Sequence, residues 1–188
     1  SSYELSHERE YHAIRVAAAL FDISPLYKYQ VTGRDAGSLL DRVVTRDVMR
    51  APVGQVLNTP WCDSAGKVLD DGTVARLDET AFRMTSADPN LRWLEDCALG
   101  LGVQVEDVSD ALCALALQGP NARAILEQVA DADLAGLKYF RIAPARLAGV
   151  PVTVSRTGYT GDLGYEIWLD AAHALQVWDA LIAAGRGY

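Results

Sequence analysis

The sequence is poor in cysteine, histidine and basic residues, and these shortages exclude several kinds of site. Its three cysteines match neither a zinc-ligand spacing nor a CxxC redox pair. Its three histidines are scattered along the chain, so we expect no metal site. Lysine and arginine number 17 against 25 acidic residues, which gives a formal net charge of −8, and they form no basic stripe. Because phosphate neutralisation dominates nucleic-acid affinity, we expect no nucleic-acid partner.

Long apolar runs are also missing. No stretch approaches the roughly 20 apolar residues that span a bilayer, and the first ten residues carry too many charges for a signal peptide. Unpatterned cysteines favour a reducing compartment. We therefore expect a cytoplasmic protein with no membrane partner. The sequence also lacks the signatures of a Ser/His/Asp or Cys/His nucleophile and of a phosphate-binding loop.

The composition is that of a folded domain. Half of the 188 residues are hydrophobic and 22% are charged, and hydrophobic periodicity predicts an α+β chain. We expect the carboxylates of Asp35 and Asp88 to cap the helices that follow them. The predicted helices cover 8–20, the segments after Asp35 and after Asp88-Pro89, 120–130 and 172–184. The predicted strands cover 27–32, 56–63, 67–77, 80–86, 103–108, 112–118, two strands within 139–157, and 165–169.

The two halves of the chain begin alike. VTGRDAGSLLDRV, starting at Val31, aligns with LQGPNARAILEQV, starting at Leu117, so that Gly33 matches Gly119. A shared strand–Gly–helix start is common in α+β proteins, so coincidence is the alternative. The simplest account is two βαββαβ-like (ferredoxin-like) units, each with helices on one face of a sheet.

This account divides the chain into three parts. Residues 1–25 form an N-terminal helix and lead-in, 26–110 the first unit and 111–188 a second, truncated unit. The second unit lacks a counterpart of the strand at 103–108, which would leave an apolar sheet edge open. We therefore expect the natural chain to continue beyond residue 188.

A glycine-rich connection joins two strands of the second unit. It reads TGYTGDLGYEI from Thr157 to Ile167, and its glycines allow positive φ and close backbone approach. Glu166 falls on the strand face opposite Ile167, beside Trp168. Taken alone, the pattern fits an ordinary hairpin loop followed by a solvated glutamate.

With Arg156, this stretch resembles the most characteristic motif of the glycine-cleavage T-protein (aminomethyltransferase) family. Four shorter motifs occur in the family's order: FDIS at 21–24, TRDV at 45–48, GKVLDD at 66–71 and LALQGP at 115–120. The resemblance covers about residues 11–188, and five motifs in the right order argue against coincidence. The resemblance implies a T-protein-type folate-binding fold without the family's C-terminal barrel domain. It also implies a tetrahydrofolate-dependent one-carbon transferase, although this fragment alone need not be active.

The resemblance assigns roles to residues of this sequence. Glu166 matches the glutamate that holds the pterin ring, and its carboxylate can accept from a ring N–H and an exocyclic amine side by side. Tyr159 matches a folate-contacting tyrosine, and Trp168 is a further candidate because it shares the strand face of Glu166. Tetrahydrofolate is expected to bind in a cavity lined by both units.

Asp71 matches the family's second aspartate of the Asp-Asp pair, at the reactive folate nitrogens, and is the expected catalytic residue. On a strand over 67–77 it would share a mostly apolar face with Leu69, so desolvation should raise its pKa toward that of a general base. Asp70 points the other way and is structural or solvated. The alternative for both is an acidic pair at a strand edge.

Two departures concern the one-carbon donor. Asn58 stands where the T-proteins of glycine cleavage carry a tyrosine, and Ser24 to Tyr27 replaces their Ser-His-Met-Gly. Asn58 or Tyr27 could serve a different donor. The donor, a small molecule or a carrier protein, stays open, as does the oligomeric state.

Three alternatives stay open beside the aminomethyltransferase. The first is a folate-dependent demethylase that takes methyl groups from oxygen, nitrogen or sulfur. The second is a non-enzymatic folate-binding protein of iron–sulfur assembly or tRNA modification, although the iron–sulfur relatives' Lys-Gly-Cys motif is missing here. The third is one module of a larger flavin-dependent dehydrogenase of methylated glycines.

Overall fold

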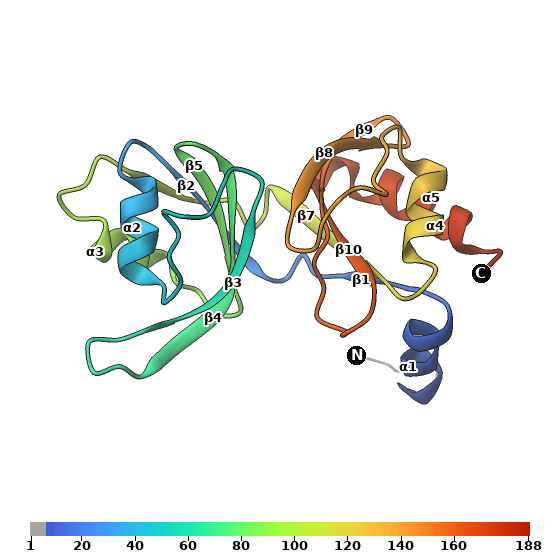
Figure 1. Ribbon diagram of the computed structural model, residues 1–188, viewed down its shortest axis with the longest axis horizontal. Coiled ribbons are helices and arrows are strands. Elements are labelled where there is room, and N and C mark those ends of the chain that lie inside the picture. The colour runs from blue at the N-terminus through green and yellow to red at the C-terminus, as the bar shows by residue number, and fades with distance from the viewer. Residues whose placement is uncertain (1–6) are drawn as a thin grey trace. The chain divides into compact units, whose positions relative to one another are not determined.

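The computed structural model describes residues 7–188 (Figure 1), so the first six residues of the charged N-terminal segment lie outside the described part. The chain divides into two compact units. We call Ser24–Asp110 the middle unit. The terminal unit combines the described residues up to Ile23 with Ala111–Tyr188. Each unit has its own five-stranded sheet and its own core.

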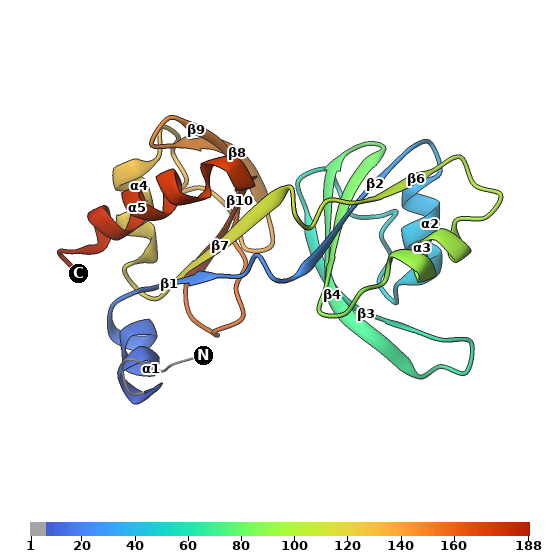
Figure 2. The same cartoon turned by 180° about the vertical axis from the view of Figure 1, so that it is seen from behind.

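The middle unit is a five-stranded antiparallel sheet with order β3-β4-β5-β2-β6 and two helices on one face (Figure 2). Apolar side chains of α2 pack on the sheet, with Leu39 and Leu40 fully buried. Its elements are β2 (Tyr27–Thr32), α2 (Ala36–Val43), β3 (Val56–Cys62), β4 (Val68–Asp78), β5 (Ala81–Ser86), α3 (Leu91–Cys97) and β6 (Gln104–Asp107).

The terminal unit repeats this arrangement, with strand order β1-β7-β10-β9-β8 and α4 and α5 packed together. Its core includes Ile125, Leu126 and Val177 from the helices. Its elements are α1 (His7–Val16), β1 (Ala19–Asp22), β7 (Leu112–Gln118), α4 (Ala122–Val129), β8 (Ile142–Leu147), β9 (Val150–Ser155), β10 (Gly164–Asp170), η1 (Ala171–His173) and α5 (Ala174–Gly185).

The α+β class with two similar units is confirmed, and each sheet carries one edge strand more than the four of a ferredoxin-like unit. The repeat has a local structural cause. Gly33 and Gly119 have nearly the same left-handed φ, +126° and +127°. A Cβ there would lie 2.4 Å from the carbonyl oxygen of Gly102 and 2.6 Å from that of Ala17, respectively. Only glycine fits such a position without strain.

The prediction of an open sheet edge in the second unit is wrong, because β1 occupies that edge. β1 pairs antiparallel with β7, from Ala19 opposite Gln118 to Asp22 opposite Leu115. The predicted helix over 8–20 therefore ends early, at Val16. Ala18 and Phe21 continue the apolar helical period of Tyr11 and Ile14, but the helix ends before them and Phe21 lies in β1. Residues assigned to a separate lead-in thus complete this sheet.

Both predicted carboxylate caps are wrong. The Asp35 side chain makes no cap hydrogen bond to α2 and accepts instead from the backbone N–H of Gly102 at 2.6 Å. Helix α3 begins at Leu91 after Asn90, two residues later than Asp88-Pro89 suggested. For Asp35 a contact distant in sequence replaced the local one, which propensity does not reveal.

No helix among residues 7–188 is both long and apolar enough to cross a membrane.

Candidate functional site

The glycine-rich connection between β9 and β10 lies in the terminal unit, and its three glycines have different tasks. Gly161 has a left-handed φ of +77°. Gly158 and Gly164 have no such φ, but a Cβ on either would lie 2.0 Å from Oε1 of Gln118. The expectation of positive φ therefore holds for one glycine, and the other two leave room for a neighbouring side chain.

That side chain, Gln118 at the end of β7, is 1% exposed. Its Nε2 donates to the carbonyl oxygens of Thr157 at 3.3 Å and Tyr165 at 3.4 Å. Its Oε1 accepts from the Thr160 hydroxyl at 3.1 Å. The amide thus holds both ends of the glycine-rich connection.

Glu166 extends from β10 on the sheet face opposite the helices, as the alternation predicted. Its neighbours in sequence, Tyr165 and Ile167, are fully buried in the helix-side core, whereas Glu166 is half-buried. Its Oε2 accepts a hydrogen bond of 2.7 Å from the Thr157 hydroxyl. The carboxylate is therefore held in a defined orientation.

A second hydroxyl extends this contact. Ser155 Oγ lies 2.7 Å from Thr157 Oγ1, and both residues are buried. A hydroxyl has one proton, and that of Thr157 is directed at Glu166, so Ser155 donates to Thr157. The row Ser155–Thr157–Glu166 ends on a charge-assisted hydrogen bond, which is stronger than a neutral one. Sequence reasoning missed Ser155, Thr157 and Gln118 as supporting residues, although Thr157 and Gln118 lie inside quoted motifs.

Two aromatic candidates differ in accessibility. The Tyr159 side chain, in the connection itself, is 91% exposed and offers an open ring and hydroxyl. Trp168 shares the strand face of Glu166 but is only 5% exposed, so it presents little surface to a ligand.

Helix α1 contacts the same connection. The Arg15 guanidinium forms an ion pair with Asp162 and lies over the Tyr11 ring, 5.1 Å from its centroid. The pKa of Arg15 is raised, first through its hydrogen bond to Tyr11 and then through the charge of Asp162. No local pattern predicted this long-range pair.

In the middle unit, Asp71 lies on β4 and is exposed. The desolvation expected for its carboxylate is wrong, because Asp71 itself is exposed; on the same strand face Leu69 is exposed, Thr73 is half-buried and only Ala75 is buried. Asp71 can therefore meet a ligand or solvent directly.

Asp70 is the buried member of the pair, at 9% exposure. Its Oδ1 accepts from the N–H of Asp71 at 2.7 Å, and its Oδ2 accepts at 3.0 Å from both the N–H of Asp88 and Nδ2 of Asn90. Asn90 Oδ1 in turn accepts from Trp61 Nε1 at 3.2 Å. These contacts agree with the structural interpretation of Asp70 and exclude the solvated one.

The structure brings Asn58 and Asp71 to one face of the β3–β4 hairpin. Asn58 lies opposite Thr73 and Pro60 lies opposite Asp71, so the two side chains are diagonal neighbours. Both are exposed. Tyr27 packs instead against the helix-side core of the middle unit, and the structure does not bring it to this face.

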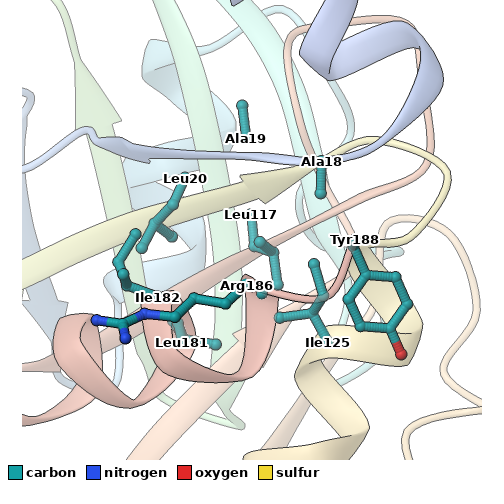
Figure 3. A pocket seen from close by; sticks show the side chains of 10 residues that line it. Ala18, Ala19, Leu20, Leu117, Ile125, Leu181, Ile182, Arg186 and Tyr188 are labelled. Carbon is teal, nitrogen blue, oxygen red and sulfur yellow. The ribbon is translucent and has the colours of Figure 1, made fainter.

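A hollow of about 170 Å³ lies elsewhere in the terminal unit (Figure 3). Its wall is apolar apart from Arg186 and the Tyr188 hydroxyl, and it includes none of the six predicted site residues. The lining residues are Ala18, Ala19, Leu20, Leu117, Ile125, Leu181, Ile182, Gly185, Arg186 and Tyr188.

Comparison with known proteins agrees with this arrangement. Residues 1–188 match the GCVT N-terminal domain family. The chain is 41% identical over 190 residues to the trimethylamine-oxide aldolase of Ruegeria pomeroyi, covering 95% of this chain and 24% of that protein. It is 37% identical over 188 residues to the aminomethyltransferase of Bacillus subtilis, covering 97% of this chain and 52% of that protein.

A solved structure shows the same fold. The glycine cleavage system aminomethyltransferase T of Bartonella henselae superposes with a TM-score of 0.83 at 28% identity, covering 93% of this chain and 48% of that one. The chain therefore spans about half, or less, of the length of each of these three relatives.

Proposed function

Because the chain belongs to the GCVT N-terminal domain family, we propose that it is the tetrahydrofolate-binding part of a one-carbon transferase. The observation that carries the proposal is the Glu166 carboxylate, half-buried on the helix-free face of its sheet and oriented by the Thr157 hydroxyl. Its relatives include an aminomethyltransferase and a trimethylamine-oxide aldolase. The activity, donor and cofactor of this protein are our proposal.

The residues of the terminal unit fit a pterin. A pterin edge presents an N–H and an exocyclic amine side by side, and a carboxylate accepts both with charge assistance. Glu166 would hold that edge, and the open ring of Tyr159 would contact the ring system. When bound, tetrahydrofolate supplies N5 or N10 as the acceptor of the one-carbon unit.

Asp71 is the proposed proton-handling residue. Its carboxylate is exposed, and its backbone N–H is fixed by the buried Asp70. We assign it the proton that the folate nitrogen loses when it accepts the one-carbon unit. Positioning of the reacting groups would supply much of the remaining rate enhancement.

One comparison and one residue favour a different one-carbon donor. The Ruegeria relative is named for trimethylamine oxide, and it is somewhat more similar to this chain than the Bacillus aminomethyltransferase. Asn58 is the exposed neighbour of Asp71 and replaces a tyrosine of the T-proteins of glycine cleavage. The alternative to an aminomethyl donor is therefore a methylated amine. Incubating the full-length protein with each donor and tetrahydrofolate, and identifying the folate product, separates the two.

The folate proposal is tested by titrating the chain with tetrahydrofolate under anaerobic conditions. Glu166→Gln should weaken affinity about tenfold or more, because a hydrogen bond to a charged group contributes about 1.5–3 kcal/mol. Glu127→Gln, which changes an exposed glutamate on α4, should leave affinity unchanged. If the well-folded wild-type chain has no measurable affinity, or Glu166→Gln binds equally well, the proposal fails.

A further inference from the structure

We propose that Gln118 is the positioning residue that aims the Glu166 carboxylate, a role that rests on the proposed function of Glu166. The first support is that both N–H groups and the oxygen of its amide have hydrogen-bond partners. The two N–H groups of its amide serve two carbonyl oxygens, those of Thr157 and Tyr165, and its oxygen serves the Thr160 hydroxyl. The reversed amide would direct an oxygen at two carbonyl oxygens, so the pattern fixes its orientation.

These contacts reach Glu166 from both sides. Thr157 supplies the hydroxyl that donates to Glu166 Oε2, and Tyr165 is the residue before Glu166. One amide therefore fixes the backbone of the donor residue and the peptide that leads to the acceptor. Glutamate at position 118 would offer no donor to the two carbonyl oxygens, and methionine would remove both of these hydrogen bonds.

The glycine spacing of the connection follows from the same side chain. Gly158 and Gly164 lie against the Gln118 amide, where a Cβ would be within 2.7 Å of its Cδ, Oε1 and Nε2. Neither glycine has a left-handed φ, so backbone strain does not explain them. Gln118 and these glycines act as one unit that closes the connection against the end of β7.

The packing of Gly158 against the Gln118 amide is tested by a double-mutant cycle. Gly158→Ala should lower the melting temperature by roughly 5 °C through overpacking. In a Gln118→Ala background the same substitution should cost clearly less, because the amide is gone. Gly136→Ala, at a site with nothing within 4 Å, is the matched control and should be near neutral. Equal costs of Gly158→Ala in both backgrounds would contradict the contact.

The positioning of the Glu166 carboxylate by Gln118 is tested by measurements on Glu166 itself. Gln118→Met should move the ¹³C resonance of the Glu166 carboxyl in the same direction as Thr157→Val, and both should weaken tetrahydrofolate binding about tenfold. Thr157→Ser keeps the hydroxyl and should restore the wild-type resonance and affinity. A merely structural role for Gln118 would lower stability without this shared signature.

The two proposals fail in different ways. If the wild-type chain does not bind tetrahydrofolate, the proposed function falls, and the carboxyl resonance still decides whether Gln118 orients Glu166. If Glu166→Gln weakens binding while Gln118→Met leaves both affinity and resonance unchanged, the positioning role of Gln118 is overturned.

Discussion

Asp70 and Asp71 are adjacent on β4 and lie in opposite environments, because the pleat of a strand turns successive side chains to opposite faces. The Asp70 carboxylate is buried and accepts three hydrogen bonds. The Asp71 side chain is exposed, and only its backbone N–H is bound by Asp70. At the scale of residues, one carboxylate supports the strand and the other is available for chemistry.

Asp71→Asn should therefore keep tetrahydrofolate affinity and stability near those of the wild type while lowering turnover of the full-length protein. The expected loss is about 10²–10⁴-fold, the usual contribution of a positioned acid or base. Steady-state kinetics and a parallel titration measure the two effects separately. Asp110→Asn, an exposed aspartate of the same unit, serves as the control. Undiminished turnover in Asp71→Asn would remove Asp71 from the mechanism.

The Asp35 carboxylate should contribute a pH-dependent part of the stability. Its pKa is lowered from 3.8, first by the backbone N–H of Gly102 and then, against some desolvation, by Arg34. A depressed folded pKa means that the contribution is present above pH 4 and is lost as the pH falls through the folded pKa. Asp35→Asn should thus be less stable than the wild type at neutral pH, and the difference should shrink as the pH falls below 3.8. Urea unfolding at several pH values measures it, and a constant difference would contradict the assignment.

At the scale of elements, the two units share a strand–Gly–helix start in which the glycine touches a distant backbone carbonyl. In the middle unit Gly33 meets Gly102, just before β6, and in the terminal unit Gly119 meets Ala17, just before β1. β1 therefore has the position in the terminal sheet that β6 has in the middle sheet.

Gly119→Ala should be strongly destabilising because two costs add. A left-handed φ costs a non-glycine residue about 1–2 kcal/mol, and overpacking costs about 1–3 kcal/mol. Gly149→Ala, at φ +83° with nothing within 4 Å, should show only the first cost. Thermal unfolding of the two variants compares them. Similar melting temperatures would mean that the chain before β1 can move away from β7.

Local patterns in the sequence predicted most elements, and contacts distant in sequence explain the misses. β2 and β7 were found with their observed bounds, β2 from its alternation of apolar and polar residues and β7 as a nearly continuous apolar run. The boundary of α1 was missed because Ala18 and Phe21 continue a helical period, although Phe21 lies in a strand. The Gln118 contact was missed because nothing in a single sequence shows which side chain lies against a glycine. The exposure of Asp71 likewise depends on which face of the sheet the helices cover.

At the scale of the whole molecule, the middle unit is an insertion into a strand pair of the terminal unit. β1 and β7 are antiparallel neighbours, and the ladder continues past them with a hydrogen bond of 2.9 Å from Ile23 N to the Ala114 carbonyl oxygen. Residues 24–110 thus stand where a short hairpin loop could connect the two strands.

Replacing residues 24–110 with a short glycine-containing loop should therefore leave a terminal unit that folds. We expect a cooperative thermal transition and dispersed amide resonances, because β1, β7 and the helix-side core are all retained. The same chain without residues 19–22 is the control and should lose cooperativity. A molten terminal unit in the first variant would show that its sheet depends on the middle unit.

Because β1 pairs with β7, which is synthesised much later, the pairing also affects the order of folding on the ribosome. β1 leaves the exit tunnel before β7 and must wait until β7 has been synthesised. In the interval every strand of the middle unit becomes available, and its folding joins Lys28 N to Ser109 Oγ at 2.9 Å. That contact brings the two ends of the insertion together before β7 emerges. The long segment between β1 and β7 is then already closed, so the conformational entropy lost when β1 pairs with β7 is smaller.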